Sequence, residues 1–266
     1  HDRTRFEIVA FDYSRDRKSV YRDRVLAAFD KVVTIRGLSD QDAARAIAAE
    51  RIAIAIDLTG WATGSRSHIL GHRPAPVAMQ WLGFPGTLGA PWVDYIVADP
   101  VVAPPGCEAE FSEKLLRLPH SYQSNDRKRL IGDRVTRAAV GLPEDAFVFC
   151  SFNQAFKIHR DNFALWMELL RAKPDSVLWL LDDNRWATEA LRARAREFGI
   201  APERVIFAPR VTMPKHLARL RLADLALDAP PCGAHTTCSD ALWAGTPHLA
   251  FRGEAFTSRV AASLLT

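Results

Sequence analysis

The residues with the clearest chemical potential cluster at one strand-to-helix junction in the last third of the chain. A β-rich run over residues 224–228 leads into a loop of proline, cysteine and glycine, and polar side chains stand where a helix is expected to begin: His235, Thr236, Thr237 and, one turn further, Asp240. Free amides and the positive dipole end of a helix N-terminus suit an anionic phosphate. The hydroxyls and the imidazole would add hydrogen bonds, and the carboxylate would accept from a ribose hydroxyl. The alternative interpretation is an ordinary N-cap threonine beside a loop histidine.

Two further junctions in the second half carry groups suited to a nucleotide. Gln154 and Lys157 follow the β-rich run over residues 146–152, and a lysine with amides at that point neutralises phosphate without a metal. His216 and Arg219 are three residues apart on an expected helix, so they share a face that could bracket a uracil base. The alternatives are a polar loop with a surface lysine and a solvated helix face.

A fourth candidate lies in the first half, after an expected strand at residues 76–82. Leu82, Gly83 and Pro85 follow there, and glycine lets the backbone approach a ligand closely. A structural turn explains the same residues equally well. The strand end at Asp57 is a further candidate of this kind.

Several other chemistries lack their motifs. The sequence has no phosphate loop of the form GxxxxGK followed by Ser or Thr, no HExxH, no GxSxG and no spaced Cys/His set. Asp182 and Asp183 follow an expected strand but precede a charged helix, so we assign them no role. We therefore expect no metal and no cofactor.

The composition is that of a globular protein with dispersed charge. The 266 residues are 48% hydrophobic and 25% charged, with a formal net charge of +4 and a pI near 9.0. Acidic and basic residues are interleaved, without a Lys/Arg stripe that carries stacking aromatics, so no nucleic-acid partner is expected. No run approaches the roughly 18 apolar residues of a membrane span, and we expect no export leader. Four cysteines without a CxxC pair indicate free thiols and a cytoplasmic location.

Short apolar runs alternate with helical patterns, which predicts an α/β fold with parallel sheets. In the second half, strands are expected at residues 146–152, 176–181, 204–207, 224–228 and 247–251, with helices at 161–171, 185–198, 214–222, 237–244 and from about 255. In the first half, strands are expected at 6–11, 32–35, 52–57, 76–82 and 95–98, with helices near 19–29, 40–50 and 65–71.

A polar, charged segment at residues 123–133 separates the two halves. We place the boundary there, which gives an N-terminal lobe over residues 1–133 and a C-terminal lobe over residues 134–266. Two Rossmann-like lobes facing a cleft are the predicted architecture. The chain opens directly into an expected strand and stops inside an expected helix, so we expect it to be truncated at both ends.

In their order along the chain, these segments resemble the catalytic region of the protein O-linked N-acetylglucosamine (O-GlcNAc) transferases, a TPR-bearing family of animals, plants and many bacteria. The matching segments run from about residue 50 to the end, and include Asp57-Leu-Thr-Gly-Trp61, Trp81-Leu-Gly-Phe-Pro-Gly-Thr87, Gly141-Leu-Pro-Glu-Asp145, Phe152-Asn-Gln-Ala-Phe-Lys157, His235-Thr-Thr237, Asp240-Ala-Leu-Trp-Ala-Gly-Thr-Pro247 and Ser258-Arg-Val-Ala-Ala262.

The resemblance implies a GT-B fold and inverting, metal-independent transfer of N-acetylglucosamine from UDP-GlcNAc to Ser/Thr hydroxyls of proteins. It also implies roles for the candidate residues. Gln154 and Lys157 would contact the diphosphate, with Lys157 catalytic in stabilising the departing UDP. His216 and Arg219 would hold the uracil, while ribose and phosphate would be bound by His235, Thr236, Thr237 and Asp240. Leu82, Gly83 and Pro85 would border the sugar.

The sequence departs from the family at several points. The His-Pro motif early in the N-terminal lobe has no match, and Met213 stands where animal enzymes carry a lysine. The long domain that animal enzymes insert between the lobes is absent, because residues 121–141 connect them directly; we take this as the sign of a bacterial form. TPR repeats that recruit protein substrates are expected N-terminal to this chain.

Three alternatives stay open from the sequence. A related transferase could use another donor or acceptor, such as UDP-glucose and Asn. A UDP-N-acetylglucosamine 2-epimerase has the same two-lobe architecture, but its acid/base set is not found here. A catalytically incomplete nucleotide-sugar-binding fragment is the non-enzymatic alternative.

Overall fold

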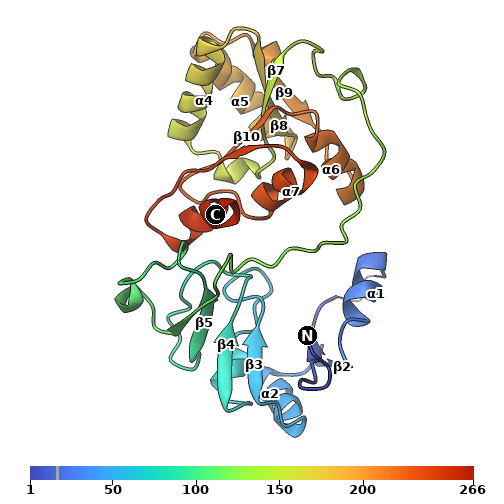
Figure 1. Ribbon diagram of the computed structural model, residues 1–266, viewed down its shortest axis with the longest axis vertical. Helices are drawn as coiled ribbons and strands as arrows, with labels where there is room; N and C mark the ends of the chain where they lie inside the picture. Colours follow the sequence, from blue (N-terminus) through green and yellow to red (C-terminus); the bar gives the residue numbers. More distant parts are fainter. Residues whose placement is uncertain (16–17) are drawn as a thin grey trace. The chain divides into compact units, whose positions relative to one another are not determined.

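The computed structural model describes residues 1–15 and 18–266. Helices and largely parallel sheets make up the chain, so the predicted α/β class is confirmed (Figure 1). Two compact units form, one from His1–Val97 with Glu108–Leu116 and the other from Ala98–Cys107 with Arg117–Thr266. The division into lobes near residue 133 stays a prediction.

The first unit contains two small sheets. β1 (Val9–Asp12) pairs in parallel with β2 (Lys31–Thr34), and a second sheet has the order β3-β4-β5-β6. Its strands are β3 (Ile54–Asp57), β4 (Val77–Gln80), β5 (Tyr95–Ala98) and β6 (Lys114–Arg117), and its helices are α1 (Val20–Leu26), α2 (Asp40–Ala49) and α3 (His68–Gly71). Ser39 caps α2 by accepting from the amide of Asp42, and this helix buries Ala43 and Ile47.

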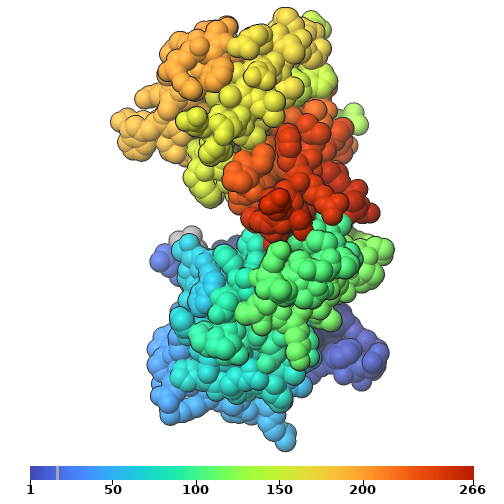
Figure 2. All heavy atoms as spheres, turned by 90° about the vertical axis from the view of Figure 1, so that its left-hand side faces the viewer, coloured from blue at the N-terminus to red at the C-terminus, as the bar shows by residue number. Residues whose placement is uncertain are grey.

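The second unit is built on one parallel sheet with the strand order β11-β10-β7-β8-β9. Its strands are β7 (Phe147–Ser151), β8 (Ser176–Leu181), β9 (Val205–Ala208), β10 (Leu225–Leu227) and β11 (His248–Leu249). The helices are α4 (Arg160–Ala172), α5 (Arg185–Glu197), α6 (Met213–Leu220), α7 (Thr236–Ala244) and α8 (Val260–Leu265). Within this unit α4 and α5, coloured yellow to orange, gather at one end, away from the red C-terminal segment (Figure 2).

Alternate residues of the central strands are buried on opposite faces of this sheet. Val148, Cys150 and Trp179 pack on one face with Leu217 of α6 and Ala241 of α7. On the other face, Phe149, Leu178 and Leu180 pack with residues of α4 and α5, including Trp166 and Ala195. A sheet covered on both faces explains why its strands are nearly continuous apolar runs.

Two expectations about elements were wrong, and one strand was not predicted. β6 was not expected, because its four residues Lys-Leu-Leu-Arg alternate in exposure and form no apolar run. The last helix begins at Val260 rather than near residue 255, since a 3-10 turn (Phe256–Arg259) precedes it. The helix expected at residues 65–71 is only the single turn α3.

Among the described residues, no helix is long and apolar enough to cross a membrane.

The turn after β4 depends on close backbone approach. Leu82 adopts a left-handed conformation with φ of +80°. A Cβ added at Gly83 would overlap the carbonyl oxygen of Leu58 and would lie 2.8 Å from that of Thr59. These carbonyls belong to the segment that follows β3, so the absence of a side chain at Gly83 lets two strand ends come together. At Gly86 the nearest atom to an added Cβ is a ring carbon of Phe84 at 3.7 Å, an ordinary contact.

We expect Gly83→Ala to lower the free energy of unfolding by about 1–3 kcal/mol, because the added methyl group must displace backbone. The matched control Gly86→Ala should change it by less than about 0.5 kcal/mol. Urea unfolding of both variants measures the difference. Equal stability of the two would show that the close approach at Gly83 is not a constraint.

Candidate functional site

The sheet order of the second unit defines where a ligand would bind. After β7 the chain adds β8 and β9 on one side and then returns to place β10 and β11 on the other. Ligands of open α/β sheets bind at such a reversal, beyond the carboxyl ends of the strands. Here the two loops that meet at this point follow β7 and β10, and they contain two of the predicted junctions.

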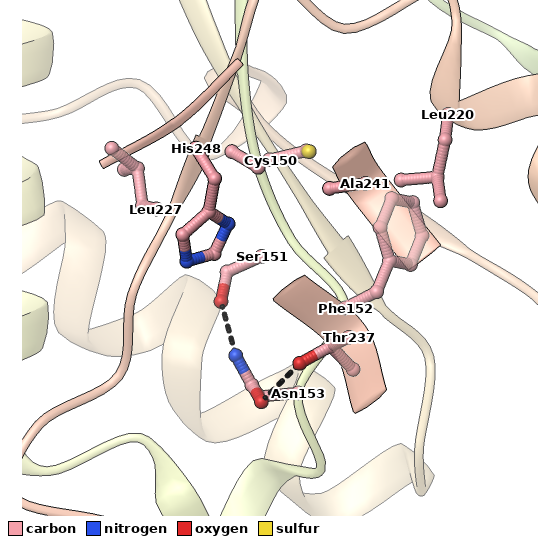
Figure 3. A pocket seen from close by; sticks show the side chains of 10 residues that line it. Cys150, Ser151, Phe152, Asn153, Leu220, Leu227, Thr237, Ala241 and His248 are labelled. Carbon is pink, nitrogen blue, oxygen red and sulfur yellow. Dashed lines mark hydrogen bonds between the residues drawn. The ribbon is translucent and has the colours of Figure 1, made fainter. Parts of the chain in front are cut away.

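Direct contacts join these two loops. The ammonium of Lys157, after β7, donates to the carbonyl oxygen of Gly233, after β10, at 3.0 Å. The Thr237 hydroxyl donates to Oδ1 of Asn153 at 2.9 Å, and Nδ2 of Asn153 donates to Oγ of Ser151 at 3.2 Å (Figure 3). Residues about 80 positions apart in sequence therefore form one cluster. The structure brings Lys157 to the loop that leads into α7, two residues before the N-cap residue His235.

The start of α7 presents amides and one exposed threonine. His235 is the N-cap residue, and its carbonyl accepts the bond from the amide of Ser239, so the amides of Thr236 and Thr237 precede that bond. Thr236 is exposed. Because the Thr237 hydroxyl gives its proton to Asn153, it can only accept from a ligand. The expectation that both hydroxyls donate to a phosphate is therefore limited, in this conformation, to Thr236.

Asp228 fixes the shape of the loop that leads into α7. Its Oδ1 accepts from the amides of Ala229 at 2.8 Å and Ala234 at 2.6 Å, and its Oδ2 accepts from the amide of Phe251 at 3.0 Å. The side chain is 1% exposed. Gly233 within the loop has a φ of +77°. We did not assign Asp228 a role from the sequence; an aspartate that ends a strand before a Gly-containing loop was the available signal.

His235 is directed to the protein rather than outward. Its Nε2 lies 2.8 Å from the carbonyl oxygen of Thr257 and 3.2 Å from that of Cys232. Carbonyls only accept, so Nε2 carries the proton and Nδ1 is left as an acceptor. Burial lowers the pKa of this ring below its ordinary value, which keeps it neutral.

The third junction, on α6, is connected to the same place through Phe152. The Arg219 guanidinium lies 4.6 Å from the Phe152 ring centre, donates to the carbonyl of Pro209 at 2.6 Å and donates through Nε to Nδ1 of His216 at 3.1 Å. Arg219 is 5% exposed, and burial lowers its pKa to about 10. Since a guanidinium cannot accept, Nδ1 of His216 is unprotonated and Nε2 carries the proton. Burial, and then the charge of Arg219, lower the pKa of His216 to about 4.

Asp240 lies four residues after Thr236, on the same face of α7. It is 6% exposed, and its Oδ1 pairs with the guanidinium of Arg129. Burial raises the pKa of Asp240, and the arginine opposes that shift. Arg129 belongs to the polar segment at residues 123–133, and no local pattern in the sequence connected it with α7.

Two hollows flank this cluster in the second unit. An open groove of about 420 Å³ is lined by the segment Phe156 to Arg160 together with Pro231 and Cys232, so Lys157 faces it; Gln154 is exposed nearby in sequence. A much smaller space, about 10 Å³, lies among Ser151, Asn153, Thr237 and His248 (Figure 3). That space holds about one water molecule and no nucleotide.

The remaining predictions concern other parts of the chain. Leu82, Gly83 and Pro85 belong to the first unit, where they form the turn after β4, and their contact with a sugar stays a prediction. Within residues 1–15 and 18–266, no group of three or more His, Cys, Asp or Glu could hold a metal ion.

The substitution Asp228→Asn tests how strongly the loop depends on its carboxylate. The side-chain amide would present an N–H where one carboxylate oxygen now accepts, so we expect the free energy of unfolding to fall by about 1.5–3 kcal/mol. Asp145→Asn, at an exposed position, is the matched control and should change it little. Chemical unfolding curves of both variants decide; an unaffected D228N variant would contradict the assignment.

The lowered pKa of His216 predicts a loss of stability in acid. Between the ordinary pKa near 6.5 and the folded-state value near 4, the unfolded chain binds a proton that the folded chain does not. The contribution of His216 to the free energy of unfolding is therefore complete above pH 6.5. It declines as the pH falls, by on the order of 2 kcal/mol at pH 5. Unfolding measured at pH 7.5 and pH 5 should show a smaller decline in His216→Gln than in the wild type. Exposed His120, changed to Gln, should leave the decline intact; if H216Q behaves in the same way, the prediction is wrong.

Comparison with known proteins places this geometry among glycosyltransferases. The probable UDP-N-acetylglucosamine–peptide N-acetylglucosaminyltransferase SEC of Arabidopsis thaliana is 35% identical over 270 residues, which is 99% of this chain and 28% of that protein. The UDP-N-acetylglucosamine–peptide N-acetylglucosaminyltransferase of Caenorhabditis elegans is 26% identical over 378 residues, with 100% of this chain and 33% of that protein covered. The chain thus spans a third or less of the length of these curated relatives. The plant relative aligns without a long insertion, so the absence of one is not specific to bacteria.

A solved structure agrees with the fold. A lysine-to-methionine mutant of the Thermobaculum terrenum O-GlcNAc transferase superposes with a TM-score of 0.90 at 28% identity, over 100% of this chain and 50% of that one, which confirms the predicted GT-B type. An Anabaena protein in complex with UDP and glucose shares only the fold, with a TM-score of 0.55 at 11% identity and 96% of this chain covered. The profile of Glycosyl transferase family 41 matches residues 1–138 and 133–266. The chain belongs to glycosyl transferase family 41.

Proposed function

We propose that this chain is the part of an inverting glycosyltransferase that binds UDP-N-acetylglucosamine and moves N-acetylglucosamine to Ser/Thr hydroxyls of proteins. The observation that carries the proposal is the contact of the Lys157 ammonium with the loop that leads into α7, at the reversal of the sheet. The names of the relatives supply the donor and the peptide acceptor.

The diphosphate of the donor would lie against the first turn of α7. The amides of Thr236 and Thr237 and the Thr236 hydroxyl are donors there, and the helix dipole favours negative charge. Lys157, held at 3.0 Å from the Gly233 carbonyl by its present hydrogen bond, needs only to exchange that acceptor for a phosphate oxygen. Amides and one ammonium neutralise the anion, which supports the expectation that no metal is required.

The nucleoside would extend from this point toward α6. His216 offers an Nε2–H donor, which complements a carbonyl of uracil. Arg219 fixes the orientation of the His216 ring through its hydrogen bond to Nδ1. Asp240 would accept from ribose, Gln154 would contact the diphosphate, and Nδ1 of His235 would accept a hydrogen bond. Leu82, Gly83 and Pro85 would border the sugar from the first unit.

The transfer would be a single displacement at the anomeric carbon. The acceptor hydroxyl oxygen forms a bond to that carbon as the bond to the diphosphate oxygen breaks, and the configuration at the carbon inverts. The hydroxyl proton passes to a general base. None of the residues named above is assigned that role. Negative charge grows on the leaving diphosphate, where Lys157 and the α7 amides stabilise it. TPR repeats elsewhere in the protein would recruit acceptors, in the cytoplasm.

Two measurements test the function. Isothermal titration of UDP should show binding, and mass spectrometry of a Ser/Thr peptide incubated with UDP-GlcNAc should show addition of one N-acetylhexosamine. A parallel reaction with UDP-glucose and an Asn peptide tests the related transferase activity. Binding without transfer to any peptide would identify a donor-binding part only, and absence of UDP binding would refute the proposal.

Lys157→Met tests the role of the ammonium. We expect the transfer rate to fall about 10²–10³-fold while the fold is kept, because charge stabilisation of the leaving group is lost. Lys128→Met removes an exposed lysine outside the cluster and should leave the rate unchanged. The rates are compared at saturating UDP-GlcNAc, with circular dichroism as the check on folding. A K157M variant with a near-normal rate would remove Lys157 from the mechanism.

A further inference from the structure

The carboxylate of Asp240 is held at one oxygen and open at the other. Oδ1 pairs with NH1 of Arg129. Oδ2 accepts no hydrogen bond from any residue in the described part of the chain, and it is not among the fully buried unpaired atoms, so it keeps contact with solvent. The side chain is 9% exposed, so a nearly buried carboxylate keeps one acceptor oxygen accessible to solvent on α7.

Arg129 is fixed by contacts that a surface ion pair would lack. Its NH2 donates to Oγ of Ser239 at 3.0 Å and to the carbonyl of Ser239 at 3.3 Å, so the planar guanidinium spans two neighbouring residues of α7. The guanidinium lies 5.3 Å from the ring centre of Trp243, whose Nε1 donates to the carbonyl of Arg129 at 3.2 Å. These contacts fix the orientation of the Arg129 guanidinium.

Without this arginine, Asp240 would be a nearly buried carboxylate with no cation beside it. Such a group takes up a proton or turns toward water, because an unpaired buried charge is unfavourable. Protonation would remove Oδ2 of Asp240 as an acceptor, and a rotation toward water would change its orientation. The pair thus does more than attach residues 123–133 to α7: it sets which oxygen of Asp240 a ligand can reach.

We propose that Arg129 is a positioning residue for the donor nucleotide, which holds the Asp240 carboxylate with Oδ2 turned toward a ribose hydroxyl. This rests on the proposed function, in which a uridine diphosphate lies along α7. Arg129 itself does not touch the nucleotide; it acts through Asp240. A loss of Arg129 should therefore matter only for ligands that carry ribose hydroxyls.

Titration calorimetry with UDP and with 2′,3′-dideoxy-UDP separates this role from a structural one. Arg129→Gln should weaken UDP binding about tenfold and dideoxy-UDP binding by less than about twofold, since only UDP donates to Asp240. Arg129→Lys keeps a cation and should recover part of the loss for UDP. The matched control is Arg127→Gln, an exposed arginine of the same segment, which should bind both ligands like the wild type.

The outcomes separate the two levels of the proposal. Retained dideoxy-UDP binding shows that the variant is folded around the site. Equal weakening of both ligands by R129Q, or weakening of neither, overturns the positioning role. A wild type that binds both ligands equally shows that Asp240 does not contact ribose, which overturns the inference and leaves the proposed function standing. A wild type that binds neither ligand refutes both.

Discussion

The carboxylate of Asp228 is the constraint on which the candidate site depends. It satisfies three amides, from Ala229, Ala234 and Phe251, that no regular ladder would reach. Those bonds hold the loop between β10 and α7 in the shape that presents the Gly233 carbonyl to Lys157. The start of α7 is positioned by the same loop, because the amide of Ala234 directly precedes its N-cap residue. The geometry of the proposed diphosphate site is therefore fixed by a residue that is 1% exposed.

A second constraint links the site to the core. Phe152 follows β7 on the buried face, where its ring lies edge-on to Trp179 and to His216. The Arg219 guanidinium packs over the same ring. The orientation of α6 is therefore set by side chains that belong both to the hydrophobic core and to the proposed base-binding corner. Substitutions in this core would therefore alter the positions of His216 and Arg219 without changing those residues themselves.

The sequence predicted much of this from local patterns, and the limits of those patterns are physical. Strand ends and helix starts mark the loops after β7 and β10 because apolar runs and turn residues are local signals. Their meeting follows from the return of β10 to the side of β7, which the alternation of elements does not specify. The pair of Arg129 with Asp240 joins residues 111 positions apart and leaves no periodic trace. The direction of the Thr237 hydroxyl depends on Asn153, so a motif of two threonines overstated the donors available.

Three polar side chains of the candidate site have their donor or acceptor roles fixed by a partner within the protein. Asn153 takes the Thr237 proton, Arg219 occupies Nδ1 of His216, and Thr257 takes the Nε2 proton of His235. The outward pattern of donors and acceptors is thus decided before any ligand arrives. Dipoles that do not have to reorient stabilise developing charge more effectively than those of water, which must. The lowered pKa values of His216 and His235 serve the same end, because they favour the neutral rings, whose tautomers the hydrogen bonds fix. Burial of these polar groups costs free energy on folding, but it also fixes the donor and acceptor pattern that a ligand would meet.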